Sequence, residues 1–337
     1  AIKQVPYRTA KDSRITAALI KAAESGKQVT ALVEIKARFD EARNLDRADE
    51  LHRAGVQIVY GVKGLKTHAK VSLVIRREAG AIKRYCHFGT GNYNESTAKI
   101  YTDISLLTSR SSLGSDASLV FNAITGRSKL TKLRHLVPAP TQMKKRVLEL
   151  IASETSRAKS GGKAAITAKI NALQDKDVID ALYKASKSGV KIKLNIRGIC
   201  CLKPGSRKEA RNIKVVSIID HYLEHARIFH FHQGGDDLVF ISSADWMTRN
   251  LEKRIELMIP ILESTNKATL INILEATFRD NTQSHLLQED GSSERIIAEP
   301  NELFRLQESF QASAIKTAKA KTQARASTFD PHLPSDS

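Results

Sequence analysis

Two segments of this chain each combine a histidine with a cation two residues later. His68-Ala-Lys70 is followed by Gly89-Thr-Gly-Asn92, and His225-Ala-Arg227 is followed by Ser242-Ser-Ala-Asp245. Because residues two apart on a strand point to the same side, we expect each segment to place an imidazole beside a positive charge. Facing each other, the two segments would form one phosphate pocket with a histidine on either side. The predicted chemistry is attack on phosphorus through a phosphohistidine.

Each residue type in these segments suits that chemistry. Neutral imidazole, with an ordinary pKa of about 6.5, is available as a nucleophile near neutral pH. Lys70 would hold phosphate oxygens as a point charge, and Arg227 would fork two donors onto them. The paired glycines allow close backbone approach, and Asn92 could orient the second nitrogen of His68. The alternatives are a surface histidine at position 68 and a structural histidine at position 225.

A repeat indicates how the two segments are positioned. Residues 18–26 (ALIKAAESG) and 181–189 (ALYKASKSG) are identical at six of nine positions, at an offset of 163 residues, and both lead into β-rich sequence. Chance similarity of two helix ends is the alternative, because a helix followed by glycine is common. We interpret the repeat as a duplicated fold.

The local patterns predict alternating helices and strands, hence mixed sheets with helices on their faces. Asp12 or Ser13 caps the first predicted helix. The predicted elements are a helix at 14–25, a strand at 29–35, a helix at 40–53, strands at 56–60, 68–76, 83–88 and 102–107, a boundary at 130–140 and a second alternation at 142–288.

Composition excludes several classes of protein. The 337 residues are 41% hydrophobic, enough for one large or two ordinary cores, and the length alone suggests two domains. No apolar run approaches the roughly 20 residues of a membrane helix, and the N-terminus lacks the apolar stretch of a signal peptide. Three cysteines, two of them adjacent, fit neither a disulfide framework nor a metal motif and favour a reducing cytoplasm. Since the chain opens on Ala within a strand-like stretch, we expect a piece of a longer protein.

The formal net charge of +18 requires a polyanionic partner. Nucleic acid is the usual candidate, but aromatic residues are only 5% of the chain, and no basic strand carries the aromatic side chains that stack on bases. We therefore predict no specific nucleic acid partner. A phosphate polymer would respond to the same field.

The two half-sites resemble those of the phospholipase D superfamily, in which two His-x-Lys segments form one centre. That motif has an aspartate five positions after the lysine, where this chain has Ile75. The second half-site also has Arg227 in place of lysine and Asp245 in place of asparagine. These departures argue against an ordinary phosphodiesterase of that superfamily.

Six further segments are more specific, and they resemble the C-terminal half of bacterial polyphosphate kinase. The resemblance covers residues 1 to about 288, without that family's N-terminal and helical domains. The segments are residues 33–40 (VEIKARFD), 61–70 (GVKGLKTHAK), 87–94 (HFGTGNYN), 101–107 (YTDISLL), 222–227 (YLEHAR) and 242–250 (SSADWMTRN).

This resemblance implies reversible transfer of the terminal phosphate of ATP onto polyphosphate, with ATP or ADP as nucleotide and Mg²⁺ as cofactor. His68 matches the histidine that carries the phosphoryl group. His225 matches its partner across the site, either the acid that assists the leaving oxygen or a stabiliser of charge.

The resemblance also implies a phosphate and nucleotide site. Arg8 and Arg38 match arginines of a magnesium-phosphate site; since arginine cannot ligate a cation, we interpret both as clamps on phosphate oxygens that the metal bridges. Tyr101 and Arg197 match positions that contact the nucleotide. Simpler readings are a surface ion pair for Arg38, a core position for Tyr101 and a structural ion pair for Arg197.

The expected fold is α/β, with two tandem phospholipase-D-like domains that face each other, each a mixed sheet flanked by helices. We place them at residues 1–135 and 136–290, followed by a helical or disordered tail at 291–337. The resemblance implies a homo-oligomeric full-length protein in the cytoplasm, while this shorter chain would be weakly active alone. Two other functions stay open: a phospholipase-D-like phosphodiesterase or nuclease, and a non-catalytic module that binds polyanions.

Overall fold

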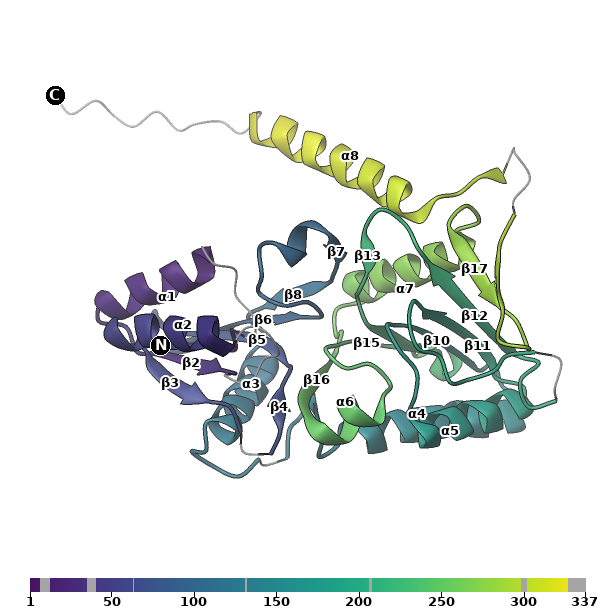
Figure 1. The fold of residues 1–337 in the computed structure, drawn as a ribbon, viewed down its shortest axis with the longest axis horizontal. Coiled ribbons are helices and arrows are strands. Elements are labelled where there is room, and N and C mark those ends of the chain that lie inside the picture. Colours follow the sequence, from purple (N-terminus) through teal and green to yellow (C-terminus); the bar gives the residue numbers. More distant parts are fainter. Residues whose placement is uncertain are drawn as a thin grey trace.

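The structure is a computed structural model that describes residues 1–6, 13–34, 41–62, 64–130, 132–205, 208–297 and 302–326. Two predicted phosphate clamps, Arg8 and Arg38, lie outside these described residues. The chain forms two halves side by side, with the long helix α8 at one edge (Figure 1).

The first half is built on a six-stranded mixed sheet with the order β3-β2-β1-β5-β6-β8. The strands β1, β2 and β3 are parallel, and β5, β6 and β8 continue antiparallel. Its strands are β1 (Ile2–Gln4), β2 (Val29–Val33), β3 (Gln57–Tyr60), β5 (Lys70–Glu78), β6 (Ala81–Gly89) and β8 (Ser105–Thr108).

The second half repeats this topology strand for strand. Its central order is β12-β11-β10-β14-β15-β16, with three parallel strands followed by three antiparallel ones. These strands are β10 (Ala165–Ile170), β11 (Lys191–Ile196), β12 (Ile213–Ile218), β14 (Ile228–Phe231), β15 (Leu238–Ser242) and β16 (Arg254–Pro260). The sheet is extended by β17 (Ser284–Leu287), β18 (Ser293–Arg295), β9 (Val137–Ala139) and β4 (Lys66–Thr67).

The helices α1 and α5 contain the repeated sequence. Ser13 caps α1 by accepting the amide of Thr16, and Asp175 caps α5 by accepting the amide of Val178. The helices are α1 (Arg14–Glu24), α2 (Glu41–Arg53), α3 (Ser111–Ile124), α4 (Met143–Lys159), α5 (Lys176–Lys187), α6 (Thr248–Lys253), α7 (Ser264–Arg279) and α8 (Leu306–Ala326), with short 3₁₀ turns η1 (Thr97–Lys99) and η2 (Gln233–Gly235).

Three hydrophobic clusters fill the layers. One packs α1 and α2 against the outer face of the first sheet, and another packs α4 and α5 against the outer face of the second sheet. The third lies between the two sheets and includes α3 and α7. Because this middle cluster contains residues of both halves, such as Phe121 and Leu257, the halves share one core.

The structure confirms the expected fold class of two mixed sheets flanked by helices and facing each other. Most predicted elements of the first half are present, with ends shifted by a few residues. The strand predicted at 102–107 is wrong, because this segment forms two strands in different sheets, β7 (Tyr101–Thr102) paired with β13 (Leu223–Glu224) and β8 paired with β6. After residue 290, β18 still pairs with β17, and α8 begins at Leu306.

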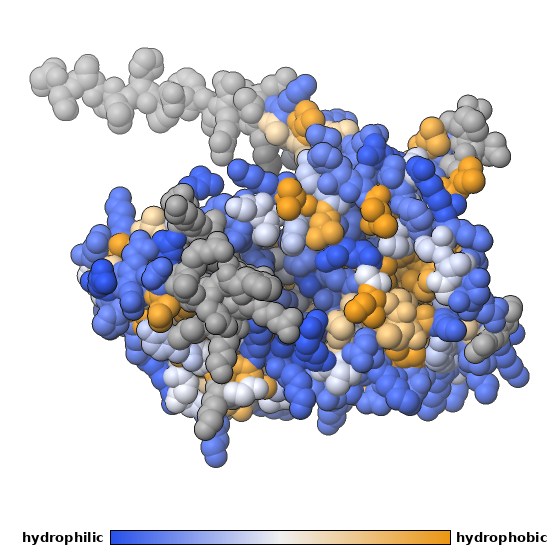
Figure 2. All heavy atoms as spheres, viewed as in Figure 1, coloured by the Kyte–Doolittle hydropathy of each residue, from blue (hydrophilic) through white to orange (hydrophobic). Residues whose placement is uncertain are grey.

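The face of the molecule in Figure 2 is mostly hydrophilic, with small scattered hydrophobic patches. Within the described residues, no helix is both long and apolar enough to cross a lipid bilayer.

Candidate active site

His68 lies in a short break between β4 and β5, not within a strand as the sequence predicts. The reason is that the chain leaves the first sheet here and pairs with the second. Strand β4 runs parallel to β16, and the amides of His68 and Ala69 both donate to the carbonyl of Ile255, at 2.8 and 2.9 Å. This pairing places His68 next to Glu256.

Glu256 holds the imidazole of His68. The Nδ1 of His68 lies 2.9 Å from the Glu256 Oε2, and the carboxylate is fully buried. Ser243 donates its hydroxyl to the same oxygen at 2.5 Å, and Asn250 donates to the other oxygen at 2.7 Å. A carboxylate fixed in this way selects the tautomer with a proton on Nδ1, which leaves the lone pair on Nε2.

His225 has the equivalent surroundings with the halves exchanged. The two-residue strand β13 (Leu223–Glu224) pairs in parallel with β7 (Tyr101–Thr102) of the first half, and the His225 amide donates to the Thr102 carbonyl at 3.2 Å. The next residue, Asp103, lies 2.9 Å from the Nδ1 of His225 through its Oδ1. Thr90 donates its hydroxyl to that oxygen at 2.6 Å.

The two half-sites are thus related by a pseudo-twofold exchange. Each histidine is anchored by a carboxylate from the opposite half, and each carboxylate accepts a hydroxyl donor from its own half. The hydroxyls also accept matching amides: Ile104 donates to Thr90 and Leu257 donates to Ser243, each at 3.0 Å. The site exists only while the two halves are together.

The two cations are buried at equivalent places. Lys70 is 2% exposed and donates its Nζ to the carbonyl of His68. Arg227 is 3% exposed, and its Nη1 donates to the carbonyl of His225 at 3.0 Å and to that of Thr90 at 3.2 Å. The same Nη1 lies 3.1 Å from the His225 Nε2. Both charges therefore lie beside a histidine, as the sequence predicts.

The two departures in the second half-site, Arg227 and Asp245, compensate each other. Arg227 donates Nε and Nη2 to the two carboxylate oxygens of Asp245, at 3.1 and 3.0 Å. Asp245 also accepts the backbone and side-chain amides of Asn171, at 2.7 and 3.1 Å. Arg197 joins this network by donating its Nε to the Asn171 Oδ1 at 2.6 Å. A buried guanidinium replaces the lysine, and a carboxylate replaces the asparagine to balance it.

Burial sets the protonation of the first half-site. It lowers the pKa of the His68 imidazole to about 4, against the opposing effect of Glu256. Burial also lowers the pKa of the Lys70 ammonium to about 7, with Arg227 and Arg254 acting in the same direction. Burial alone would raise the pKa of Glu256, but His68, Lys70 and the Ser243 hydroxyl hold it below its ordinary value. His68 is therefore neutral and Glu256 ionised at pH 7.

The second histidine is also held neutral. Burial lowers the pKa of His225, with Arg227 and Lys70 adding to the shift and Asp103 opposing it. Lys70 affects His225, and Arg227 affects His68, so each cation acts across the two half-sites. Together with the 3.2 Å hydrogen bond from Arg227 to the carbonyl of Thr90 in the first half, this coupling indicates that the two imidazoles and two cations belong to one centre.

A cavity of about 720 Å³ opens beside this centre, between α1, the first sheet and residues 91–105. Tyr101 lines it, and its ring lies 4.9 Å from that of His225, so Tyr101 is not a core residue. Asn92 also lines it, but its buried Oδ1 has no hydrogen-bond partner among the described residues. The orienting role that the sequence assigns to Asn92 is therefore filled by Glu256.

The described residues do not form a protein-held magnesium site at this centre. Asp103 is engaged by His225, Glu256 by His68 and Asp245 by Arg227. Within the described part of the chain, these carboxylates leave no oxygen cage of the kind that Mg²⁺ requires. The two arginines assigned to a magnesium-phosphate site, Arg8 and Arg38, lie outside that part.

No motif in the sequence indicated the two anchoring carboxylates, Asp103 and Glu256. Asp103 lies inside one of the distinctive segments, and Glu256 lies 153 residues later, close to the 157 residues that separate the histidines. Neither this histidine spacing nor the 163-residue offset of the repeat leads from one carboxylate to the other, because position 260 is proline and position 266 is asparagine. The sequence also does not show that each carboxylate binds the histidine of the other half.

Comparison with protein families gives two adjoining matches. A family model described as polyphosphate kinase C-terminal domain 1 matches residues 1–130, and one described as polyphosphate kinase C-terminal domain 2 matches residues 136–307.

Individual relatives agree with these matches. The chain is 51% identical over 335 residues to a polyphosphate kinase of Rhodopirellula baltica, and the match covers 99% of this chain and 39% of the relative. It is 49% identical over 302 residues to a polyphosphate kinase of Halalkalibacterium halodurans, covering 90% of this chain and 43% of the relative. The chain therefore spans less than half the length of these relatives.

Among solved structures, the chain resembles a polyphosphate kinase from Porphyromonas gingivalis. The TM-score is 0.86 at 39% sequence identity, and the match covers 96% of this chain and 49% of that chain. The two halves and their relative placement are thus shared with a solved protein.

Proposed function

The chain belongs to the polyphosphate kinase family, and we propose that it carries the catalytic half of a reversible ATP:polyphosphate phosphotransferase that works through a phosphohistidine. The observation that supports this most directly is the reciprocal anchoring of two imidazoles by Glu256 and Asp103. It leaves the Nε2 of His68 as the reactive nitrogen, in a centre that contains two buried cations, while the Nε2 of His225 lies 3.1 Å from the Arg227 Nη1.

In the proposed first step, the Nε2 lone pair of His68 attacks the terminal phosphorus of ATP. A P–N bond forms as the bond from phosphorus to the bridging oxygen breaks, and ADP leaves with the electron pair. His68 is neutral because its pKa is lowered to about 4, and its side chain is 12% exposed, which gives substrate an edge to approach. In the second step, a terminal oxygen of polyphosphate attacks the same phosphorus and the P–N bond breaks.

The cations have the electrostatic role in this proposal. Phosphoryl transfer passes through a loose transition state with its charge on the equatorial oxygens, so positive charge and positioning dominate catalysis. Lys70 would supply charge beside His68, and Arg8 and Arg38 would clamp phosphate oxygens. Arg227 is already paired with Asp245, so its main effect would be to hold His225 in place.

His225 would assist the departing oxygen once substrate is bound. Burial and two cations hold its pKa low in the absence of substrate. A bound polyphosphate chain brings several negative charges, which favour the protonated ring. We assign His225 as a donor to the leaving or bridging oxygen in the complex.

We place the nucleotide in the cavity of about 720 Å³, a size that suits a small ligand. Two buried oxygens of its lining, the Asn92 Oδ1 and the Glu95 Oε2, have no hydrogen-bond partner among the described residues. Both accept hydrogen bonds, so the amino group of a base would satisfy them. Tyr101 would stack at the end near His225, and Arg197 would contact the phosphates.

Mg²⁺ would arrive as part of the Mg·ATP substrate, held by phosphate oxygens, and neutralise charge on the phosphates. We also propose the cytoplasm as the location, a homo-oligomer as the full-length state, and domain divisions near residues 135 and 290. The last strand and α8 would then belong to the C-terminal tail.

Incubation with ATP labelled at the terminal phosphate, in the presence of Mg²⁺, tests the proposal. We expect an acid-labile label on His68 that is discharged by ADP. His68→Ala should abolish it, and His221→Ala, at an exposed histidine outside the site, should leave it intact.

Three outcomes would contradict the proposal. Labelling that survives His68→Ala would reject the assigned nucleophile. Cleavage of phosphodiester substrates without any labelling by ATP would favour the phosphodiesterase alternative, and binding of polyphosphate without either reaction would favour a non-catalytic module.

A further inference from the structure

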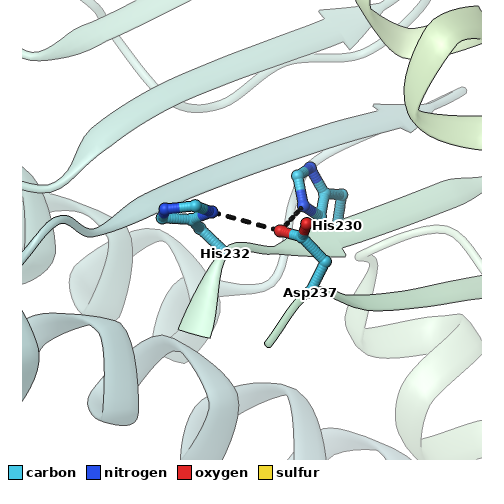
Figure 3. Close-up of side chains that lie close together, drawn as sticks. All are labelled: His230, His232 and Asp237. Atoms are coloured by element: carbon cyan, nitrogen blue, oxygen red, sulfur yellow. Dashed lines mark hydrogen bonds and ion pairs between the residues drawn. The ribbon is translucent and has the colours of Figure 1, made fainter. Parts of the chain in front are cut away.

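Three possible metal ligands meet at one end of the hairpin formed by β14 and β15 (Figure 3). The Nε2 of His230 lies 2.7 Å from the Asp237 Oδ1, and the Nδ1 of His232 lies 3.1 Å from the same oxygen. The three ligand atoms lie within 4.8 Å of one another. The cluster is outside the active site and takes no part in the proposed reaction.

We propose that His230, His232 and Asp237 bind a divalent transition metal of the Zn²⁺ type. Two imidazole nitrogens and one carboxylate oxygen are preferred ligands of Zn²⁺, which takes four ligands and often binds three from the protein with water as the fourth. Mg²⁺ and Ca²⁺ prefer oxygen ligands, so the two imidazoles select against them. A small outward shift of the carboxylate, away from the line between the two rings, would make room for the ion.

The backbone of the cluster is held in place by a buried glutamate. Glu154 is 0% exposed and accepts the backbone amide of Gln233 at 2.6 Å and its side-chain amide at 3.0 Å. Its other oxygen accepts the amide of Ala165 at 3.1 Å. These hydrogen bonds fix the turn that follows His232, so the binding of an ion would require little further ordering of the backbone.

The ligands are also accessible. The side chains of His230, His232 and Asp237 are 14%, 29% and 32% exposed, so an ion can reach them from solvent. The nearby cation Lys267 donates to the backbone carbonyl of Asp237 at 2.9 Å, on the main-chain side of that residue. The carboxylate is thus available to a metal, although this positive charge will limit the affinity.

The position in the fold suggests what the ion would do. Strand β14 begins directly after Arg227, and β15 leads directly to Ser243 and Asp245. The same hairpin therefore carries the second half-site at one end and the His–His–Asp cluster at the other. A bound ion would link the two strands and stabilise the hairpin.

A Zn²⁺ titration of the chain against a coloured chelator tests this inference without reference to catalysis. Because Cys200 and Cys201 could also bind Zn²⁺, the titration uses a Cys200→Ser/Cys201→Ser background. We expect one Zn²⁺ per chain, with the affinity reduced at least about tenfold by His232→Ala and by Asp237→Asn. His221→Ala removes an exposed histidine outside the cluster and should change nothing.

Thermal unfolding provides a second readout. Zn²⁺ that binds the folded chain raises the melting temperature, and this rise should be absent in Asp237→Asn. If His232→Ala fails to fold, Asp237→Asn alone decides, because it preserves the size of the side chain. Equal Zn²⁺ affinity in the parent and in Asp237→Asn, or equal stabilisation by Mg²⁺ and Zn²⁺, would overturn the proposal.

Discussion

Asp103 and Glu256 each hold a histidine that is distant in the sequence, 122 and 188 residues away. A carboxylate on Nδ1 fixes both the tautomer and the orientation of the ring, so it decides which nitrogen can meet phosphorus. Since the pairs cross between the halves, each imidazole is oriented only when both halves are folded. The candidate site therefore depends on the exact positions of the carboxylate oxygens of Asp103 and Glu256.

Gly91 leaves the space that the carboxylate of Asp103 occupies. A Cβ at this residue would lie 2.0 Å from the Oδ2 of Asp103, so Gly91→Ala must push the carboxylate away from His225. We expect phosphotransfer to fall by a factor on the order of 100, because small misplacements of a catalytic group are costly. Steady-state formation of ATP from polyphosphate and ADP measures the effect.

Gly80→Ala is the matched control for this substitution. Gly80 has a φ of +78° and open space around the position of a Cβ, so alanine there should cost about 1 kcal/mol of folding free energy without affecting the site. If Gly80→Ala and Gly91→Ala reduced activity equally, the steric argument for Asp103 would be wrong.

The titration of His68 is a second prediction at this scale. Burial lowers its pKa from 6.5 to about 4, so the ring should stay neutral from pH 8 down to about pH 5. Imidazole resonances of labelled chain, assigned by comparison with His68→Ala, measure this directly in the absence of nucleotide. The denatured chain should titrate near pH 6.5. A His68 midpoint near 6.5 in the folded chain would contradict the neutral nucleophile.

Lys70 predicts an alkaline limit to activity. Its pKa is lowered to about 7, so its charge is lost as the pH rises above 7, and kcat/KM should decline there because this parameter reports the free enzyme. Arginine keeps its charge throughout this range. The double variant Lys70→Arg/Asn92→Asp, which copies the Arg227–Asp245 pair, should therefore remove the decline. An unchanged alkaline limit would assign it to another group.

At the scale of elements, two short strand pairs assemble the site. The β4–β16 pair ends where His68 meets Glu256, and the β13–β7 pair ends where His225 meets Asp103. Each pair is only two residues long, yet each one sets the register that brings a histidine beside its carboxylate. The two large sheets hold the halves in place, and the short strand pairs β4–β16 and β13–β7 align each histidine with its carboxylate.

This division explains what the sequence could predict. The strand that carries Lys70 and its partner, predicted at 68–76 and 83–88, have patterns long enough to be recognised in the sequence. The His-x-Lys and His-x-Arg spacing indicated the chemistry. Two-residue strands such as Lys66–Thr67 have no periodicity, and their partners lie in the other half. The assignment of His68 to a strand was therefore wrong, and the crossing to β16 could not be anticipated.

Hydrogen exchange tests the crossings. The amides of His68 and Ala69 are bound to the carbonyl of Ile255, and the amide of His225 is bound to the carbonyl of Thr102, all across the halves. We expect residues 66–69 and 223–225 to exchange slowly and to gain protection together when polyphosphate binds. Mass spectrometry of peptides that contain these segments measures it. Protection of one segment without the other would mean that the two half-sites respond independently.

At the scale of the whole molecule, the halves share a hydrophobic core as well as a site. The middle cluster joins Leu113 and Phe121 on α3 to Leu270 and Leu274 on α7 and to the inner face of the second sheet. The repeat in the sequence predicted two similar units, but it could not show that their inner faces are apolar toward each other. Whether the inner faces of the two sheets pack against each other depends on which helix covers which face of each sheet. Short amphipathic patterns in the sequence do not specify this arrangement.

The shared core predicts that the chain unfolds as one unit. Trp246, the single tryptophan of the chain, is fully buried in the outer cluster of the second half, so its fluorescence reports on that half. Phe121→Ala removes a side chain that the first half contributes to the shared cluster, and it should cost about 3 to 5 kcal/mol of folding free energy. If the halves are coupled, the denaturation midpoint of Trp246 fluorescence should fall together with that of circular dichroism.

Leu107→Ala is the control in the first half, because this side chain is 77% exposed and its loss should change stability by less than about 0.5 kcal/mol. A Trp246 midpoint that stays fixed in Phe121→Ala while circular dichroism shows two transitions would mean that the halves fold separately. The reciprocal anchoring of His68 and His225 would then rest on the two strand crossings alone, and partial unfolding of the first half would misalign both imidazoles. If the two halves unfold together, a chain whose second half is folded also has a folded first half, and His68 and His225 then remain aligned.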